Sequence, residues 1–260
     1  YMNEATNPRR FWKAATAASK SIPSYLSQAG WSSPITSRLL FEAGAAFANK
    51  DFATFLQPGG GPNAPSYTEL STNVRWGNYS GAFGHNSSHN FNARFATSYV
   101  TGSHAAKFGV TFMRLSAHTT QDVVNNGMTL QLLQGQPRQV TVWATPLSLD
   151  EVTGANVGLF AQDQWTVRRA TLSLGVRFDS FNSYVPAQTV GPGPQVPNRN
   201  VAFEKVESVP DWKDVSPRLG VSYDLFGTGR TAVKASVGRY LEGPNLTSFT
   251  RAANPASAIV

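Results

Sequence analysis

The sequence has no cysteine and few charged side chains. Of its 260 residues only 14% are charged, whereas an ordinary soluble domain has about 25%. The absence of cysteine excludes disulfide frameworks and thiol chemistry. No run of apolar residues approaches the roughly 18 that a transmembrane helix needs, so any membrane crossing must use strands.

What the chain does contain also excludes disorder and nucleic-acid binding. Aromatic residues make up 12% of it, which is far too many for a disordered linker. The formal net charge is +7, but apart from Arg9-Arg10 and Arg168-Arg169 the basic residues are spread singly along the chain. Phosphate recognition needs clustered Lys and Arg, so we expect no nucleic-acid partner.

Apolar and polar residues alternate over many segments, which is typical of strands with two different faces. In residues 171–179, the side chains of Leu172, Leu174, Val176 and Phe178 share one face. The pattern predicts an all-β fold, an antiparallel meander of about eight long strands. The expected strands are residues 25–32, 35–47, 89–100, 105–117, 156–167, 170–183, 215–226 and 230–241.

Short turns alternate strictly with long, Pro- and Gly-rich loops between these strands. Within the long loops, residues 73–79, 128–133 and 139–145 also resemble strands, but they are too short to span a membrane. We expect them to form hairpins standing above the sheet. Tight turns on one side and long loops on the other are typical of outer-membrane barrels.

A transmembrane β-barrel in the bacterial outer membrane therefore fits better than a soluble all-β sandwich. The predicted strands exceed the usual 5 or 6 residues of globular sheets, and a face in contact with lipid cannot carry charge. Aromatic residues near strand ends are candidates for the membrane interface: Trp31, Tyr99, Trp165, Tyr184 and Tyr240.

Three stretches resemble TonB-dependent outer-membrane receptors. Residues 158–179 match a hairpin in which a Gln-Asp-x-Trp strand turns into a Leu-x-Leu-Gly-x-Arg-Phe/Tyr-Asp strand, and residues 211–240 and 101–110 support the match. Together with residues 33–44 they are similar to the Oar-like branch, whose members carry a carboxypeptidase-regulatory-like domain before the plug.

The resemblance implies a transporter for a large or scarce solute. Such receptors enclose a plug within roughly 22 strands, and the TonB complex of the inner membrane acts on the plug. Because only about eight strands are predicted, we expect residues 1–260 to be a partial barrel domain. The plug and the remaining strands would then lie outside the chain. Its expected partners are outer-membrane lipid, the plug and, through the plug, TonB.

The polar faces of the predicted strands supply the candidate site residues. They are predicted to form a lumen-facing wall: Arg94, Lys107, Arg177, Asp179, Arg218, Asp224 and Lys234. Two interpretations stay open. The basic side chains contact the plug or guide an anionic solute, or they pair with acidic neighbours and stiffen the wall.

We expect no catalytic, cofactor-binding or metal-binding residues. No nucleophile elbow, HExxH motif or phosphate loop is present. His104 is expected in a tight turn on one side of the sheet, and His85, His89 and His118 toward the loops on the opposite side, so the four are not expected to bind one metal. Two alternatives to a receptor remain: a complete eight-stranded barrel acting as an anchor or adhesin, and a soluble all-β ligand-binding module.

Overall fold

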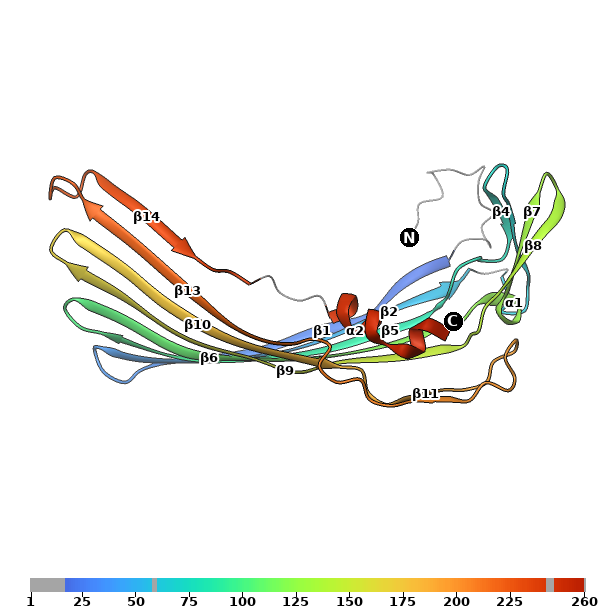
Figure 1. Ribbon diagram of the computed structural model, residues 1–260, viewed down its shortest axis with the longest axis horizontal. Helices are drawn as coiled ribbons and strands as arrows, with labels where there is room; N and C mark the ends of the chain where they lie inside the picture. The colour runs from blue at the N-terminus through green and yellow to red at the C-terminus, as the bar shows by residue number, and fades with distance from the viewer. Residues whose placement is uncertain (1–16, 58–59, 242–245, 260) are drawn as a thin grey trace.

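The fold is dominated by one antiparallel sheet of eight strands in meander order (Figure 1). The computed structural model describes residues 17–57, 60–241 and 246–259. The strands of the main sheet are β1 (Ala17–Pro34), β2 (Leu39–Leu56), β5 (Gly84–Val100), β6 (His104–Gln121), β9 (Leu147–Val167), β10 (Ala170–Tyr184), β13 (Asp211–Asp224) and β14 (Ala232–Gly238). The predicted all-β meander of eight long strands is confirmed.

The long loops carry the smaller elements. Strands β3 (Ser66–Glu69), β4 (Val74–Gly77), β7 (Met128–Leu133) and β8 (Gln136–Val142) form one sheet in the order β4-β3-β7-β8. The two expected hairpins are therefore joined, because β3 pairs with β7 in parallel. The remaining elements are β11 (Gln188–Val190), β12 (Val201–Phe203), α1 (Val124–Gly127), α2 (Leu246–Ala253) and a 3-10 helix (Pro255–Ile259). Among the described residues, no helix is long and apolar enough to cross a membrane.

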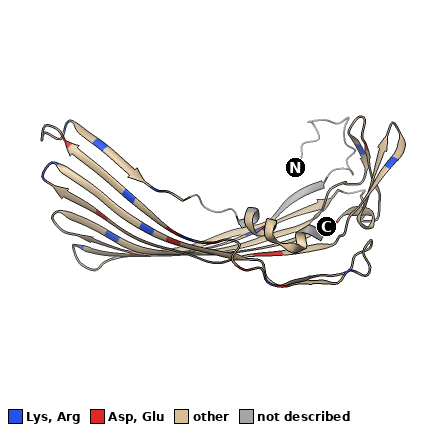
Figure 2. Ribbon diagram, viewed as in Figure 1, with Lys and Arg blue, Asp and Glu red and all other residues tan. Residues whose placement is uncertain are grey.

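The main sheet has an apolar face and a polar face. The apolar face exposes large hydrophobic side chains from neighbouring strands, among them Phe95, Phe108, Leu159, Val176 and Leu219. These residues occupy alternate positions of their strands and stay exposed among the described residues, so burial within the described part of the chain does not explain them. Charged residues are sparse over the sheet (Figure 2). Residues between those of the apolar face, such as Arg94 and Arg177, define the polar face.

Several strands extend further toward the long loops than the sequence predicts. Strand β9 begins at Leu147 rather than at residue 156 because the chain continues through a β-bulge. The bulge lies opposite Met113 to Ser116 of β6. A bulge adds one residue and so inverts the alternation. Leu147 and Leu149 are consequently buried on the polar face. In the part of β9 between the bulge and the tight turn, residues with odd numbers lie on the apolar face instead.

Helix α2 packs on the polar face near the long-loop end of the sheet (Figure 1). The ring of Phe249 meets Trp212 of β13 edge-on, with 5.1 Å between centroids, and Trp212 in turn contacts Phe181 of β10 at 5.9 Å. Arg251 Nε donates to Glu151 of β9 over 3.2 Å. Both contacts attach the segment that follows β14 to the inner side of the sheet's bend.

Glu69 connects the two hairpins of the small sheet. Its Oε1 accepts hydrogen bonds from the Ser71 hydroxyl at 2.6 Å and the Gln134 N–H at 2.9 Å, while Oε2 accepts from the Gly135 N–H at 2.9 Å. One carboxylate thus accepts hydrogen bonds from both the β3–β4 turn and the β7–β8 turn. The Ser71 hydroxyl, followed by the Gly135 N–H, lowers the pKa of Glu69 to about 2.

Replacing Glu69 by Gln should loosen the small sheet. A Gln side chain has one carbonyl oxygen and would turn its NH2 group toward an N–H donor. We expect faster hydrogen exchange at the backbone amides of Ser71, Gln134 and Gly135, measured by mass spectrometry. Glu207→Gln is the control, because Glu207 pairs with Lys205 in an exposed loop. Equal effects of the two substitutions would contradict this role.

The same contacts predict a pH dependence. A carboxyl whose pKa is lowered by folding contributes its full stabilisation above its ordinary pKa and loses it as pH falls through the lowered value. The small sheet should therefore resist pepsin at pH 4.5 and become susceptible as pH approaches about 2. Cleavage rates are normalised to an unstructured peptide. The Glu69→Gln variant should show no such step, and a step of equal size in the variant would argue against Glu69.

Candidate functional site

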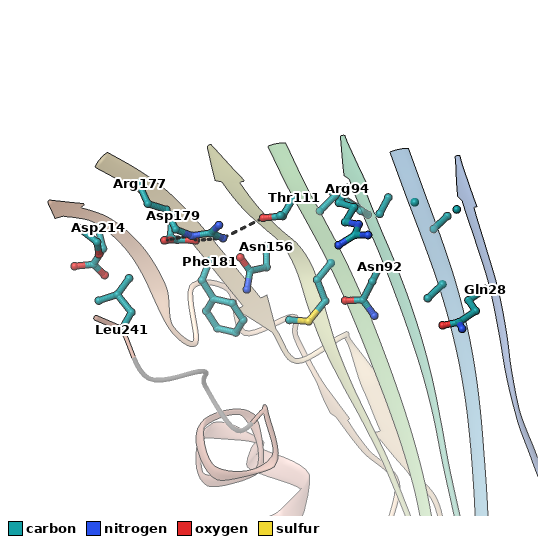
Figure 3. Close-up of a pocket in the computed structure, with 18 of the residues that line it drawn as sticks. Gln28, Asn92, Arg94, Thr111, Asn156, Arg177, Asp179, Phe181, Asp214 and Leu241 are labelled. Carbon is teal, nitrogen blue, oxygen red and sulfur yellow. Dashed lines mark hydrogen bonds and ion pairs between the residues drawn. The ribbon is translucent and has the colours of Figure 1, made fainter. Parts of the chain in front are cut away.

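The polar face contains a hollow of about 1380 Å³. Seven strands of the main sheet, all except β14, contribute to its lining. Figure 3 shows Arg94, Arg177, Asn92, Asn156 and Gln28 arranged along it from neighbouring strands. Phe181 and Trp212 also line the hollow, at the end where α2 is attached. The hollow therefore combines charged and amide side chains with apolar ones, including an aromatic surface on one side.

Arg177 is held in a fixed position. Its Nε donates to both oxygens of Asp179 at 2.9 and 2.8 Å, and Nη2 donates to the Thr111 hydroxyl at 3.0 Å. The guanidinium reaches Thr111 by crossing Gly158 of β9, where a Cβ would overlap it. The carboxylate neutralises this arginine, and glycine gives it the space to lie flat on the sheet.

Arg94 also lies against a glycine but forms no ion pair with a described residue. A Cβ at Gly44, its register partner on β2, would stand 3.2 Å from Arg94 Nε. No carboxylate of the described residues lies within ion-pair distance of Arg94. Arg218 lies over the ring of Tyr240, with 4.6 Å from its Cζ to the centroid. It likewise forms no ion pair with a described residue.

Four of the seven predicted wall residues line this hollow: Arg94, Arg177, Asp179 and Arg218. Lys107 instead pairs with Glu42 at 2.6 Å, and Asp224 accepts the Gly229 N–H of the β13–β14 turn at 2.8 Å. Lys234 lines a smaller hollow of about 440 Å³ nearer the tight turns. The structure thus shows both paired charges and unpaired ones, and the role of the wall stays a prediction.

The predicted interfacial aromatics lie in three settings. Trp31, Tyr99 and Trp165 are exposed near the tight-turn ends of their strands, and Tyr184 ends β10 at the long-loop side with Lys205 Nζ 4.5 Å from its ring centroid. Tyr240 contacts Arg218, so its ring lies on the polar face. The interfacial position expected for Tyr240 does not fit this contact.

The four histidines lie in strands β5 and β6, His104 at the tight-turn end and His85, His89 and His118 toward the long loops, as expected. The strands simply continue past the predicted ends. Three of the histidines contact separate carboxylates: His104 Nδ1 is 2.6 Å from Asp163, His118 Nδ1 is 2.7 Å from Asp150, and His85 Nε2 is 3.4 Å from Asp51. Within the described ranges, no group of three His, Asp or Glu is placed to hold a metal.

Sequence reasoning missed the uncharged part of the hollow. Phe181 and Trp212 are in phase with Arg177 and Arg218 on their strands, so the alternation contained the signal. Asn92 and Asn156 are likewise in phase with Arg94 and Gly158. Selecting charged residues alone left these amides and rings out.

The comparisons with known proteins identify the family. A family model described as an outer membrane beta barrel domain matches residues 3–260. The chain belongs to this outer membrane β-barrel family. No curated protein matches the chain. The fold is similar to the crystal structure of the outer membrane transporter YddB from Escherichia coli, with a TM-score of 0.55 and 17% identity.

Family membership explains the two faces of the sheet. In an outer membrane β-barrel the outward side chains contact lipid and the inward ones line the lumen. The similarity to YddB covers 88% of this chain but 27% of that protein, so the chain spans about a quarter of the transporter's length. The barrel's expected place in the outer membrane is confirmed.

Gly158→Ala should destabilise the barrel more than Gly175→Ala. A methyl group at position 158 would displace the Arg177 guanidinium, whereas the nearest atoms to a Cβ at Gly175 are 3.7 Å away. Overpacking costs about 1–3 kcal/mol. Urea unfolding of the intact protein in detergent measures the difference, and the backbone effect of losing glycine is common to both variants. Equal unfolding midpoints would contradict the close contact.

Proposed function

We propose that the chain forms part of the barrel of a TonB-dependent outer-membrane transporter of the Oar-like kind. The transporter takes up a solute that is too large or too scarce for porins. The observation that carries this proposal is the open meander of eight strands with a hollowed polar face. The receptor-like stretches of residues 101–110, 158–179 and 211–240 support it.

The open sheet favours a partial barrel over a complete eight-stranded one. A closed barrel would need β1 to pair with β14, yet in the described sheet these strands are the two edges. Each edge leaves backbone groups to be paired, and a lipid-embedded sheet cannot leave them so. Further strands of a larger barrel would pair with both edges.

The proposed partners follow from the two faces. Lipid contacts the apolar face. The plug of the same transporter contacts the polar face near the tight-turn end of the sheet. TonB acts through that plug. The role is transport rather than catalysis, in keeping with a barrel family and a transporter-like fold. A soluble ligand-binding module does not account for the exposed apolar face.

Because these 260 residues contain no cysteine, cysteines introduced into β10 allow a direct test of the two faces on this part of the barrel. Single cysteines on β10 are spin-labelled in the intact protein in lipid vesicles. We expect labels at Leu174 and Val176 to collide mainly with oxygen, which concentrates in lipid. Labels at Ser173 and Gly175 should collide mainly with a water-soluble nickel complex. Absence of a two-residue period would contradict a lumen on one side and lipid on the other.

Transport by a plugged barrel predicts almost no passive conductance. The intact protein in a planar bilayer should conduct little, and deletion of the plug segment should raise the conductance by at least tenfold, since it opens the lumen. In cells, growth supported by the transporter on a panel of scarce nutrients should disappear when TonB is deleted. A high conductance of the intact protein, or growth that does not depend on TonB, would overturn the proposal in favour of a porin or an anchor.

A further inference from the structure

We propose that the hollow binds an organic oxyanion, a carboxylate or phosphate group of the transported solute, with Arg94 as the binding cation. This inference names a solute class for the transporter and so rests on the proposed function for its physiological role. The binding itself depends only on the hollow. Its first support is the balance of charges around the hollow.

Most charges in the hollow are already paired. Arg177 pairs with Asp179, and Asp214 pairs with Arg239. Of the charged residues that line the hollow, Arg94 and Arg218 form no ion pair with a described carboxylate. Glu42 is near enough to interact electrostatically with Arg94, but its ion pair is with Lys107. The hollow therefore has an excess of positive charge, which raises the local concentration of anions.

Arg94 is positioned to donate into the hollow rather than into the sheet. Its side chain lies over Gly44 and points into the open space in Figure 3. In contrast to Arg177, it has no carboxylate two residues away on its strand, because Asn92 and Ala96 occupy those positions. A guanidinium with free donors matches the planar geometry of a carboxylate or phosphate.

Arg218 lies too far from Arg94 to bind the same group. Three strands, β6, β9 and β10, separate β5 from β13, which puts the two arginines roughly 19 Å apart across the sheet at 4.8 Å per strand. Arg218 adds to the positive field, and Tyr240 holds its guanidinium by a cation–π contact. Arg94 is therefore the residue that binds the oxyanion, and Arg218 contributes only its positive charge to the electrostatic potential of the hollow.

The rest of the lining suits a hydroxylated molecule of more than one ring. Amides both donate and accept hydrogen bonds. In Figure 3 Asn92 lies beside Arg94 on β5, with Gln28 on β1 and Asn156 on β9 to either side. Trp212 and Phe181 add an aromatic surface at the other end. A volume of about 1380 Å³ exceeds the roughly 300–1,000 Å³ of ordinary small-molecule sites.

Calorimetric titration of the intact protein in a neutral detergent tests the proposal. The probes are a galacturonate trimer for carboxylate, glucose 6-phosphate for phosphate and maltotriose as the neutral comparison. We expect one or both anionic probes to bind, with affinity falling as salt rises, and maltotriose to bind at least tenfold more weakly. Whichever anionic probe binds more tightly identifies the oxyanion.

Two variants remove the free charge of Arg94 in different ways. Arg94→Gln deletes it, and Asn92→Asp leaves Arg94 in place but supplies a carboxylate two residues away, as Asp179 does for Arg177. Each should weaken binding of the anionic probes at least tenfold. Arg230→Gln is the control, because it removes one positive charge from the exposed β13–β14 turn outside the hollow. It should leave affinity unchanged.

Several results would overturn the inference. These are unchanged affinity in Asn92→Asp, an equal loss in Arg230→Gln, and binding of maltotriose as tight as that of the anions. Because Asn92→Asp keeps Arg94, a folding defect of Arg94→Gln would not prevent a decision. Binding without TonB-dependent growth would leave the anion site standing and refute the transporter, whereas TonB-dependent growth without anion binding would do the reverse.

Discussion

Every strand of the main sheet must satisfy its backbone hydrogen bonds while its side chains alternate between two surroundings. The backbone requirement forces strands to pair continuously along their length, and the alternation places each residue on one face or the other. With lipid on one side, charged groups are confined to the other side and to the loops. The low charge content of the chain is thus an average over an apolar face and a polar one.

The same alternation allowed the strand ends at the tight turns to be predicted from the sequence. Between Val100 and His104, and between Val167 and Ala170, the pattern breaks at short turns, so those strand ends could be located closely. At the long-loop ends the alternation did not predict where the strands end. The bulge in β9 inverts the phase at about the place where lipid no longer dictates which face is apolar. No local signal there distinguishes a continuing strand from a loop.

The candidate site was predictable only in part, for a related reason. The positions of Arg94, Arg177 and Arg218 in the alternation of their strands indicate that all three lie on the polar face. Which of them is neutralised depends on neighbours in three dimensions. Asp179 is close in sequence to Arg177, but the contact of Arg218 with Tyr240 and of Glu151 with Arg251 depends on where the chain goes after β14. The need for glycine at positions 44 and 158 follows only from the arginine side chains that lie over them, Arg94 and Arg177.

The length of the strands sets how far the wall of the barrel extends beyond the lipid. Strands β1, β2 and β6 each contain 18 residues, which corresponds to roughly 60 Å at 3.3 Å per residue. The apolar band of an outer-membrane barrel is only about 25 Å tall, and its strands are tilted by about 45° at most. The wall therefore rises well above the outer leaflet. In the transporter proposed above, a solute would enter a vestibule, with α2 attached to its side, before it reached the depth of the lipid.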